Sequence, residues 1–177
     1  MVAFMELVCM KKMLMLVPLL LPATLLAQEF YATKPATIEC VVEAANRQGV
    51  PANVLLAISS IESGRNGQLV KNKNGSLDIG HFQINTVHWG KNGIFTRHGI
   101  KKEDVQWRGC YNAELAAWLL KQSLEENTNQ NFWVKAANYH SKNAKFNAIY
   151  RKKLMSLSVQ WGRYLESQYS NTLRVNR

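Results

Sequence analysis

A polar stretch without helical periodicity, residues 65–78, separates segments in which apolar residues recur at a helical spacing. Before it, residues 37–48 and 51–64 predict two helices, each ended by a glycine. After it, the same spacing predicts three further helices, over residues 112–124, 132–139 and 144–169. The polar stretch is rich in Asn, Lys and Gly, which favours a loop or a short β-hairpin around Asn74-Gly75. The sequence therefore predicts a mainly helical single domain, which is what 177 residues can hold.

The first 27 residues have the layout of a secretory signal peptide. Lys11-Lys12 precede an uncharged and mostly apolar run over residues 13–26, which is too short and too interrupted by proline for a membrane-spanning helix. Ala27 is the expected last residue before cleavage, and Met10 is an alternative start of the chain. A retained membrane anchor is the competing interpretation. We expect a signal peptide over 1–27, a short segment over 28–35, the folded domain over 36–169 and a flexible tail over 170–177.

The net charge of the chain is strongly positive. Lys and Arg number 22 against 12 Asp and Glu, giving +10, and removal of the signal peptide would leave +9. This balance predicts an acidic partner, which could be nucleic acid, an anionic membrane or an anionic polymer outside the cell. Export argues against nucleic acid, and cleavage leaves no stable membrane span.

Two cysteines remain after cleavage removes Cys9. Cys40 and Cys110 are an even number in an oxidising compartment, so we expect one disulfide between them. It would close a loop of about 70 residues, a constraint worth about 3–4 kcal/mol. Two free buried thiols are the alternative.

Glu62 is the most informative single residue. It ends an otherwise apolar helix and is the only acid between Glu43 and Asp78. Apolar neighbours desolvate its charge, and the negative end of the helix dipole disfavours an anion there, so both favour the protonated form. A carboxyl group that stays neutral near pH 7 is what a general acid requires. A glutamate that points into water at a helix end is the alternative interpretation.

Residues 74–85 combine turn residues, an acid, a glycine that permits close backbone approach, and two amides. This composition suits a site that hydrogen-bonds a polar chain such as a sugar. Three motifs now stand in order along the chain: Glu62-Ser63, then Gly80-His81-Phe82-Gln83-Ile84-Asn85, then Ala136-Ala137-Asn138-Tyr139-His140-Ser141.

These motifs resemble those of lytic transglycosylases of the soluble, lysozyme-like type, written Glu-Ser, Gly-Leu-Met-Gln-Ile and Ala-x-x-Tyr-Asn-x-Gly. The resemblance covers about residues 36–165 and implies a lysozyme-like fold with the polar loop or hairpin beside an active-site cleft. The sequence departs from the motifs at His81-Phe82, which replaces Leu-Met, and at His140-Ser141-Lys142, which replaces Asn-x-Gly. These departures bear on substrate fit more than on the chemistry.

The resemblance implies an enzyme that cleaves peptidoglycan between N-acetylmuramic acid and N-acetylglucosamine, without a metal or another cofactor. Glu62 would protonate the glycosidic oxygen, the C6 hydroxyl of the muramoyl sugar would attack its own C1, and a 1,6-anhydro product would form. By the same resemblance, Tyr139 would hold Glu62 by a hydrogen bond and Ser63 would support the local backbone. Sugar contacts would come from the second motif, through Gly80, Gln83 and Asn85. Apart from the resemblance, Trp89 is the tryptophan best placed to stack on a sugar in the cleft because it follows this motif, whereas core packing is the interpretation for most of the five tryptophans.

Within that family the sequence resembles the small periplasmic enzymes that accompany type IV secretion, conjugation or similar envelope machines. Those often carry a first-helix cysteine and a Cys-x-Asn, as in Cys40 and Cys110-Tyr111-Asn112. The resemblance therefore implies a periplasmic monomer whose partners are peptidoglycan strands and components of a secretion or pilus apparatus.

Asp78 leaves the product open. Residues 74–85 also resemble the active-site loop of animal-type lysozymes, in which the second catalytic acid stands where Asp78 does, so a hydrolytic muramidase that uses Glu62 and Asp78 is one alternative. An acid that caps backbone N–H groups of a turn is the structural interpretation of Asp78. A murein-binding scaffold protein without catalysis is the third function that the sequence allows. The four histidines have no metal-ligand spacing.

Overall fold

The computed structural model describes residues 35–175, with side chains to residue 168. The predicted signal peptide and residues 28–34 lie outside this range. The described chain is mostly helical with one small antiparallel sheet, so the predicted fold class is confirmed. None of its helices is long and apolar enough to cross a membrane.

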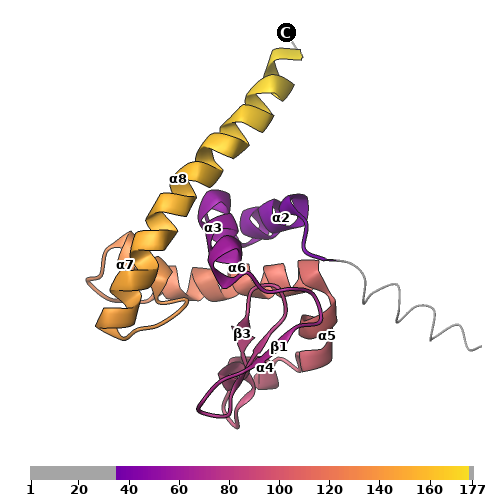
Figure 1. Cartoon of the computed structure of the whole chain (residues 1–177), viewed down its shortest axis with the longest axis vertical. Coiled ribbons are helices and arrows are strands. Elements are labelled where there is room, and N and C mark those ends of the chain that lie inside the picture. The colour runs from indigo at the N-terminus through magenta and orange to yellow at the C-terminus, as the bar shows by residue number, and fades with distance from the viewer. Residues whose placement is uncertain (1–34, 176–177) are drawn as a thin grey trace, which may run out of the picture.

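Helices form the body of the domain in the described chain (Figure 1). They are α2 (Ile38–Gln48), α3 (Ala52–Glu62), α6 (Gly109–Glu125), α7 (Phe132–Ala137) and α8 (Ala144–Val175). Each begins or ends within a few residues of the predicted bounds except α8, which continues to Val175 instead of ending at Tyr169. Residues 170–175 contain no glycine or proline, so nothing in the sequence breaks the helix there.

Helix α3 is the central element of the core. Its residues Val54–Ile58 are buried on every side, because the helix packs against α2, α6 and α8. Two polar contacts fix it to α8: the indole N–H of Trp161 donates to Ser60 Oγ at 2.9 Å, and Asn53 Nδ2 donates to the carbonyl of Ser158 at 3.1 Å. The end of α3, which carries Glu62, is thereby held at a fixed place against the last helix.

The polar stretch folds into a hairpin and a third strand. Strands β1 (Leu69–Lys71), β2 (Leu77–Ile79) and β3 (Ile84–Asn85) form an antiparallel sheet in that order. The predicted hairpin around Asn74-Gly75 is confirmed, whereas the third strand was not predicted. The register places Asp78 opposite Asn85 on the neighbouring strand.

Three short helical elements between the sheet and α6 also escaped prediction. They are η1 (Thr86–Trp89), α4 (Ile94–Arg97) and α5 (Lys102–Trp107). Each is too short for a helical period to repeat, so sequence periodicity carries no signal for them.

The predicted disulfide is confirmed. Cys40 in the first turn of α2 is bonded to Cys110 in the first turn of α6, with 5.5 Å between their Cα atoms. The bond ties the beginning of α2 to the beginning of α6.

Candidate active site

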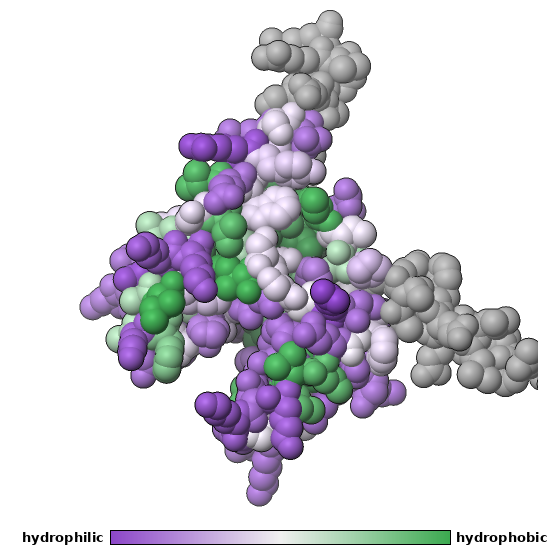
Figure 2. Space-filling view, viewed as in Figure 1, coloured by the Kyte–Doolittle hydropathy of each residue, from purple (hydrophilic) through white to green (hydrophobic). Residues whose placement is uncertain are grey.

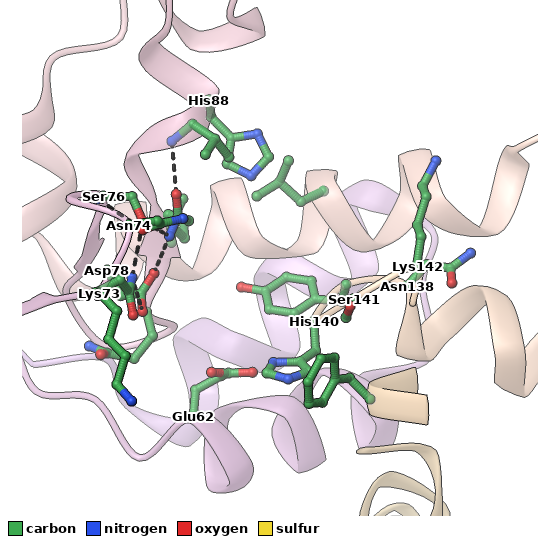
Figure 3. Close-up of a pocket in the computed structure, with 18 residues that line it drawn as sticks. Glu62, Lys73, Asn74, Ser76, Asp78, His88, Asn138, His140, Ser141 and Lys142 are labelled. Carbon is green, nitrogen blue, oxygen red and sulfur yellow. Dashed lines mark hydrogen bonds between the residues drawn. The ribbon is translucent and has the colours of Figure 1, made fainter. Parts of the chain in front are cut away.

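A cavity of about 880 Å³ lies between the sheet, the end of α3 and the turn that follows α7. Figure 3 shows Glu62 entering it from α3, Asp78 from the sheet and His140 from the turn. In the space-filling view the outline is notched between the α7 side and the sheet, and the surface there is largely hydrophilic (Figure 2). Five predicted site residues line this one cavity: Glu62, Asp78, Gln83, Asn85 and Tyr139.

Glu62 receives its hydrogen bond from a residue that the sequence analysis did not select. The hydroxyl of Tyr150, on α8, donates to Glu62 Oε1 at 2.7 Å. Within the described chain Oε2 has no hydrogen-bond partner. Because Oε1 accepts from the tyrosine, the proton of the neutral carboxyl group is left to Oε2, on a side chain that lines the cavity.

The predicted hydrogen bond from Tyr139 to Glu62 is wrong. The hydroxyl of Tyr139 donates instead to the backbone carbonyl of Phe82 at 3.1 Å. Tyr139 lies in the turn that follows α7, and its hydroxyl is directed at the loop between β2 and β3. It still lines the same cavity as Glu62. Burial, and to a smaller extent the negative charge of Glu62, raises the pKa of Tyr139 above its ordinary value.

The pKa of Glu62 is raised to about 7 from an ordinary value of 4.5. Burial is the largest cause, and the negative charge of Asp78 adds to it, whereas the hydrogen bond from Tyr150 acts in the opposite direction. A general acid for neutral pH needs a pKa near this value, so the cavity provides the protonation state that the sequence predicts for Glu62.

Asp78 is held by side-chain amides. Asn85 Nδ2 donates to its Oδ1 at 2.6 Å and Asn72 Nδ2 donates to its Oδ2 at 2.9 Å. The residue lies within strand β2 and accepts from Asn85 on β3 and from Asn72 in the turn after β1, so the expectation of a turn acid that caps backbone N–H groups is wrong. Asp78 is a fixed carboxylate in the same cavity as Glu62.

Asn85 has a structural part in this arrangement. Its Nδ2 also donates to Ser76 Oγ at 2.9 Å, and its Oδ1 accepts from the backbone N–H of Val87 at 2.9 Å and so caps η1. The side chain lines the cavity, and its contact with a sugar stays a prediction.

A buried asparagine on α6 holds the loop between β2 and β3 by hydrogen bonds. Asn112, on α6, donates to the carbonyls of Ile79 and Val105 at 3.0 Å and accepts from the backbone N–H of Phe82 at 2.9 Å. Every hydrogen-bonding group of this fully buried amide is therefore used. The Cys-x-Asn motif thus places one residue in the disulfide and the other under the candidate site.

Gly64 and Gly80 allow two backbone segments to meet beside Glu62. A Cβ atom on Gly64 would clash with the carbonyl of Gly80 and lie 2.7 Å from Gln83 Nε2. Gly80 has φ of 69° and packs on Asn112. Its place is structural, because it is not among the residues that line the cavity.

Two non-glycine residues have positive φ in the described chain, and both belong to the motifs. Ser63 (φ 50°) ends α3, and its Oγ donates to the carbonyl of Ser60 at 2.7 Å, as expected of a backbone support. Gln83 (φ 50°) donates from Nε2 to the carbonyl of Gly80 at 2.7 Å and leaves Oε1 without a partner among residues 35–175. Such strained positions cluster at functional sites.

Trp89 does not line the cavity, so its predicted sugar contact is wrong. Its indole N–H donates to the carbonyl of Ile100 at 2.6 Å, and its ring packs edge-on against buried Phe95. The exposed apolar side chains at the cavity are Val87 and Phe146 instead. No cluster of three or more metal-ligating side chains occurs between residues 35 and 175.

Tyr150 and Asn72 are the site residues that sequence reasoning missed. Tyr150 is a buried polar aromatic on the packed face of α8, one turn from buried Leu154, and only this burial pattern could have drawn attention to it. Asn72 stands in the polar stretch among other asparagines, and nothing local separates it from them.

Comparison with known proteins adds the family. Residues 39–154 match the family described as Transglycosylase SLT domain, a segment that includes Glu62, the sheet, the turn after α7 and Tyr150. Comparisons with curated proteins and with solved structures found no match. Because the match spans more than half of the chain, the protein belongs to the transglycosylase SLT domain family, whose members act on peptidoglycan outside the cytoplasm.

Proposed function

We propose that this protein is a peptidoglycan lytic transglycosylase that cleaves the bond between N-acetylmuramic acid and N-acetylglucosamine. One observation carries the proposal: a glutamate with a pKa of about 7 lines a large polar cavity, held at one oxygen by Tyr150. The resemblance of the Glu62-Ser63 motif and the raised pKa both support Glu62 as the acid of this proposal.

The reaction needs one group that gives and then takes a proton. Glu62 Oε2 donates its proton to the glycosidic oxygen as the bond to C1 breaks, and the other sugar leaves with a hydroxyl group. The C6 hydroxyl of the muramoyl sugar then attacks C1, and the carboxylate of Glu62 accepts its proton. A 1,6-anhydro ring forms, and Glu62 is again protonated.

The shape and lining of the site fit a sugar polymer. A second cavity of about 690 Å³ continues from the first, because His88, Leu119 and Tyr139 line both. Amide side chains contribute much of the polar surface of the first cavity, among them Asn72, Asn74, Gln83 and Asn138. A long groove with amide donors and acceptors suits the hydroxyl and N-acetyl groups of a glycan strand.

Digestion of purified sacculi by the wild type and by Glu62→Gln tests the proposal. Mass spectrometry should find 1,6-anhydromuramoyl ends with the wild type and none with Glu62→Gln, while Glu43→Gln, an exposed glutamate on α2, should act as the wild type does. Full clearance of sacculi by Glu62→Gln would refute the assigned chemistry. A wild type that binds sacculi and releases nothing would indicate the murein-binding scaffold.

Hydrolysis is the second candidate, and Asp78 is the observation that favours it. Its carboxylate lies in the same cavity as Glu62 and is oriented by Asn72 and Asn85, which suits a group that activates water or stabilises positive charge at C1. A muramidase would produce reducing ends, and Asp78→Asn would abolish them. In the lytic route Asp78→Asn keeps the anhydro product.

We further propose that the protein acts in the periplasm as a monomer and opens the wall locally for a secretion, conjugation or pilus apparatus. The signal-peptide pattern of residues 1–27 and the pairing of Cys40 with Cys110 support this proposal. Fractionation of cells that express the full chain would test the location. Recovery of the chain in the cytosol would count against it.

A further inference from the structure

His140 occupies an unusual place beside the Tyr150–Glu62 pair. Its ring stacks on the ring of Tyr150 in parallel, with 4.7 Å between centroids and 3° between planes. Its backbone N–H donates to the carbonyl of Ala137, the last residue of α7, so both the main chain and the ring plane are fixed. His140 lines the cavity on the side of the turn after α7 (Figure 3), and Tyr150 lies behind it on α8.

The other polar side chains of this turn are committed to the protein. Asn138 bonds to Gln130 and Asn147, and Ser141 Oγ accepts from the backbone N–H of Asn143. Lys142 is paired with Glu126.

The imidazole of His140 differs from these side chains. Within residues 35–168 neither of its ring nitrogens has a hydrogen-bond partner, although it lines the cavity. By contrast, Nε2 of His81, in the second motif, lies 2.7 Å from Ser59 Oγ, and His81 is not among the lining residues. The turn therefore presents one uncommitted donor and acceptor to the cavity, at a fixed orientation.

The charge state of His140 suits a sugar. Burial is the main influence on its pKa and lowers it, while Asp78 across the cavity acts to raise it and Lys153 on α8 acts to lower it. A neutral imidazole has one N–H donor and one acceptor nitrogen, which can pair with a hydroxyl or an N-acetyl group.

We propose that His140 is a specificity-determining residue of the lytic reaction, whose free ring nitrogens hydrogen-bond an N-acetylhexosamine unit in the subsite beside Glu62 while its ring face holds Tyr150. The inference rests on the proposed function for the substrate class. In the Ala-x-x-Tyr-Asn-x-Gly motif that this segment resembles, asparagine stands at the position of His140. The stacked ring and its sugar contact are therefore expected only in chains that carry histidine at this position.

Binding separates the contact from catalysis. We would titrate a tetramer of β-1,4-linked N-acetylglucosamine into Glu62→Gln and into the double variant with His140→Phe, by calorimetry. The phenyl ring keeps the stack on Tyr150 and removes both hydrogen bonds, so affinity should fall about three- to tenfold, as expected for neutral hydrogen bonds. The same change at His98, a histidine that is outside the cavity, should leave affinity unchanged.

Kinetics on murein then distinguish a direct contact of His140 with the sugar from a purely structural role of its ring. In the otherwise wild-type enzyme, His140→Phe should raise KM with kcat within about twofold, whereas His140→Ala should also lower kcat because Tyr150 loses its stacking partner. Three results would overturn the inference. Glu62→Gln and its His140→Phe double variant could bind the tetramer equally well, or neither could bind it. In the otherwise wild-type enzyme, His140→Phe could lower kcat without a change in KM. Absence of anhydro products from the wild type would refute the proposed function and leave the calorimetric result to decide the role of His140.

Discussion

Tyr150 and Glu62 are 88 positions apart in the chain, and the hydroxyl of one lies 2.7 Å from the carboxyl oxygen of the other. Their contact depends on the packing of α3 against α8, which the bonds from Trp161 and Asn53 also secure. The tyrosine orients the carboxyl group and opposes part of the effect of burial on its pKa. The last helix is therefore a part of the site as well as of the core.

Removal of the Tyr150 hydroxyl should make Glu62 a less well oriented and weaker acid. In Tyr150→Phe we expect the pKa of Glu62 to rise above 7, because the lost hydrogen bond favours the carboxylate. The basic limb of the kcat/KM profile should move to higher pH, and kcat should fall about tenfold because the carboxyl group is less well positioned.

Tyr164→Phe is the matched control for this prediction. Tyr164 lies on the same helix, is exposed, and packs edge-on against Trp161. Its profile should overlay that of the wild type. A Tyr150→Phe profile with an unmoved basic limb would show that the hydroxyl does not act on Glu62.

The activity of the wild type should depend on pH through Glu62. The group is useful as an acid only while protonated, so kcat/KM should be high below pH 7 and fall tenfold per pH unit well above it. Initial rates of sacculus solubilisation between pH 5 and 9, in buffers of constant ionic strength, measure this. A rate that stays constant to pH 9 would exclude Glu62 as the acid.

Glu62, Asp78 and Gln83 were all selected from the sequence, and the structure brings them into one cavity. Glu62 could be selected because an isolated acid at the end of an apolar helix is unusual. Asp78 and Gln83 come soon after it in the sequence, and the hairpin brings them to the same cavity. The residue that holds Glu62 could not be selected, because no local pattern states which tyrosine of a distant helix will face α3. Tyr139 was chosen for its place in a motif, and the structure turns its hydroxyl toward Phe82.

Trp89 illustrates the same limit. A tryptophan next to a sugar-binding motif is a reasonable candidate for the cleft, yet its side chain is directed by the 3₁₀ helix η1 toward Phe95 and Ile100. Elements shorter than two helical turns have no periodicity to read, so the direction of their side chains emerges only when the chain is packed.

The burial of Glu62 should also appear in the pH dependence of stability. Between pH 4.5 and 7 the folded protein keeps a proton that the unfolded chain releases, so the free energy of unfolding falls as pH rises through this window. The loss approaches about 3 kcal/mol above pH 7. Glu62→Gln has no such proton and should be more stable than the wild type at pH 8, with a smaller difference at pH 4.

Urea unfolding at the two pH values, followed by circular dichroism, measures this difference directly. Gln keeps the length of the side chain and can still accept from Tyr150, so packing should change little. If the two proteins lose stability in parallel from pH 4 to pH 8, the carboxyl group is ionised in the folded state at neutral pH, which contradicts its role as an acid.

Gly64 makes the strongest prediction about the architecture of the site. A methyl group there would meet the carbonyls of Gly80 and His81 and the side chain of Gln83, and the two carbonyls belong to a backbone that Asn112 holds in place. Since this backbone cannot move aside cheaply, Gly64→Ala should cost about 2–4 kcal/mol in the free energy of unfolding and reduce kcat in the protein that remains folded.

The matched variant is Gly90→Ala, where the added atom would lie 3.5 Å from the carbonyl of Val87, an ordinary contact, and φ is −63°. Urea midpoints of the two variants should therefore separate clearly. A Gly64→Ala protein as stable and as active as Gly90→Ala would mean that the end of α3 and the loop after β2 are not packed as closely as the catalytic arrangement requires.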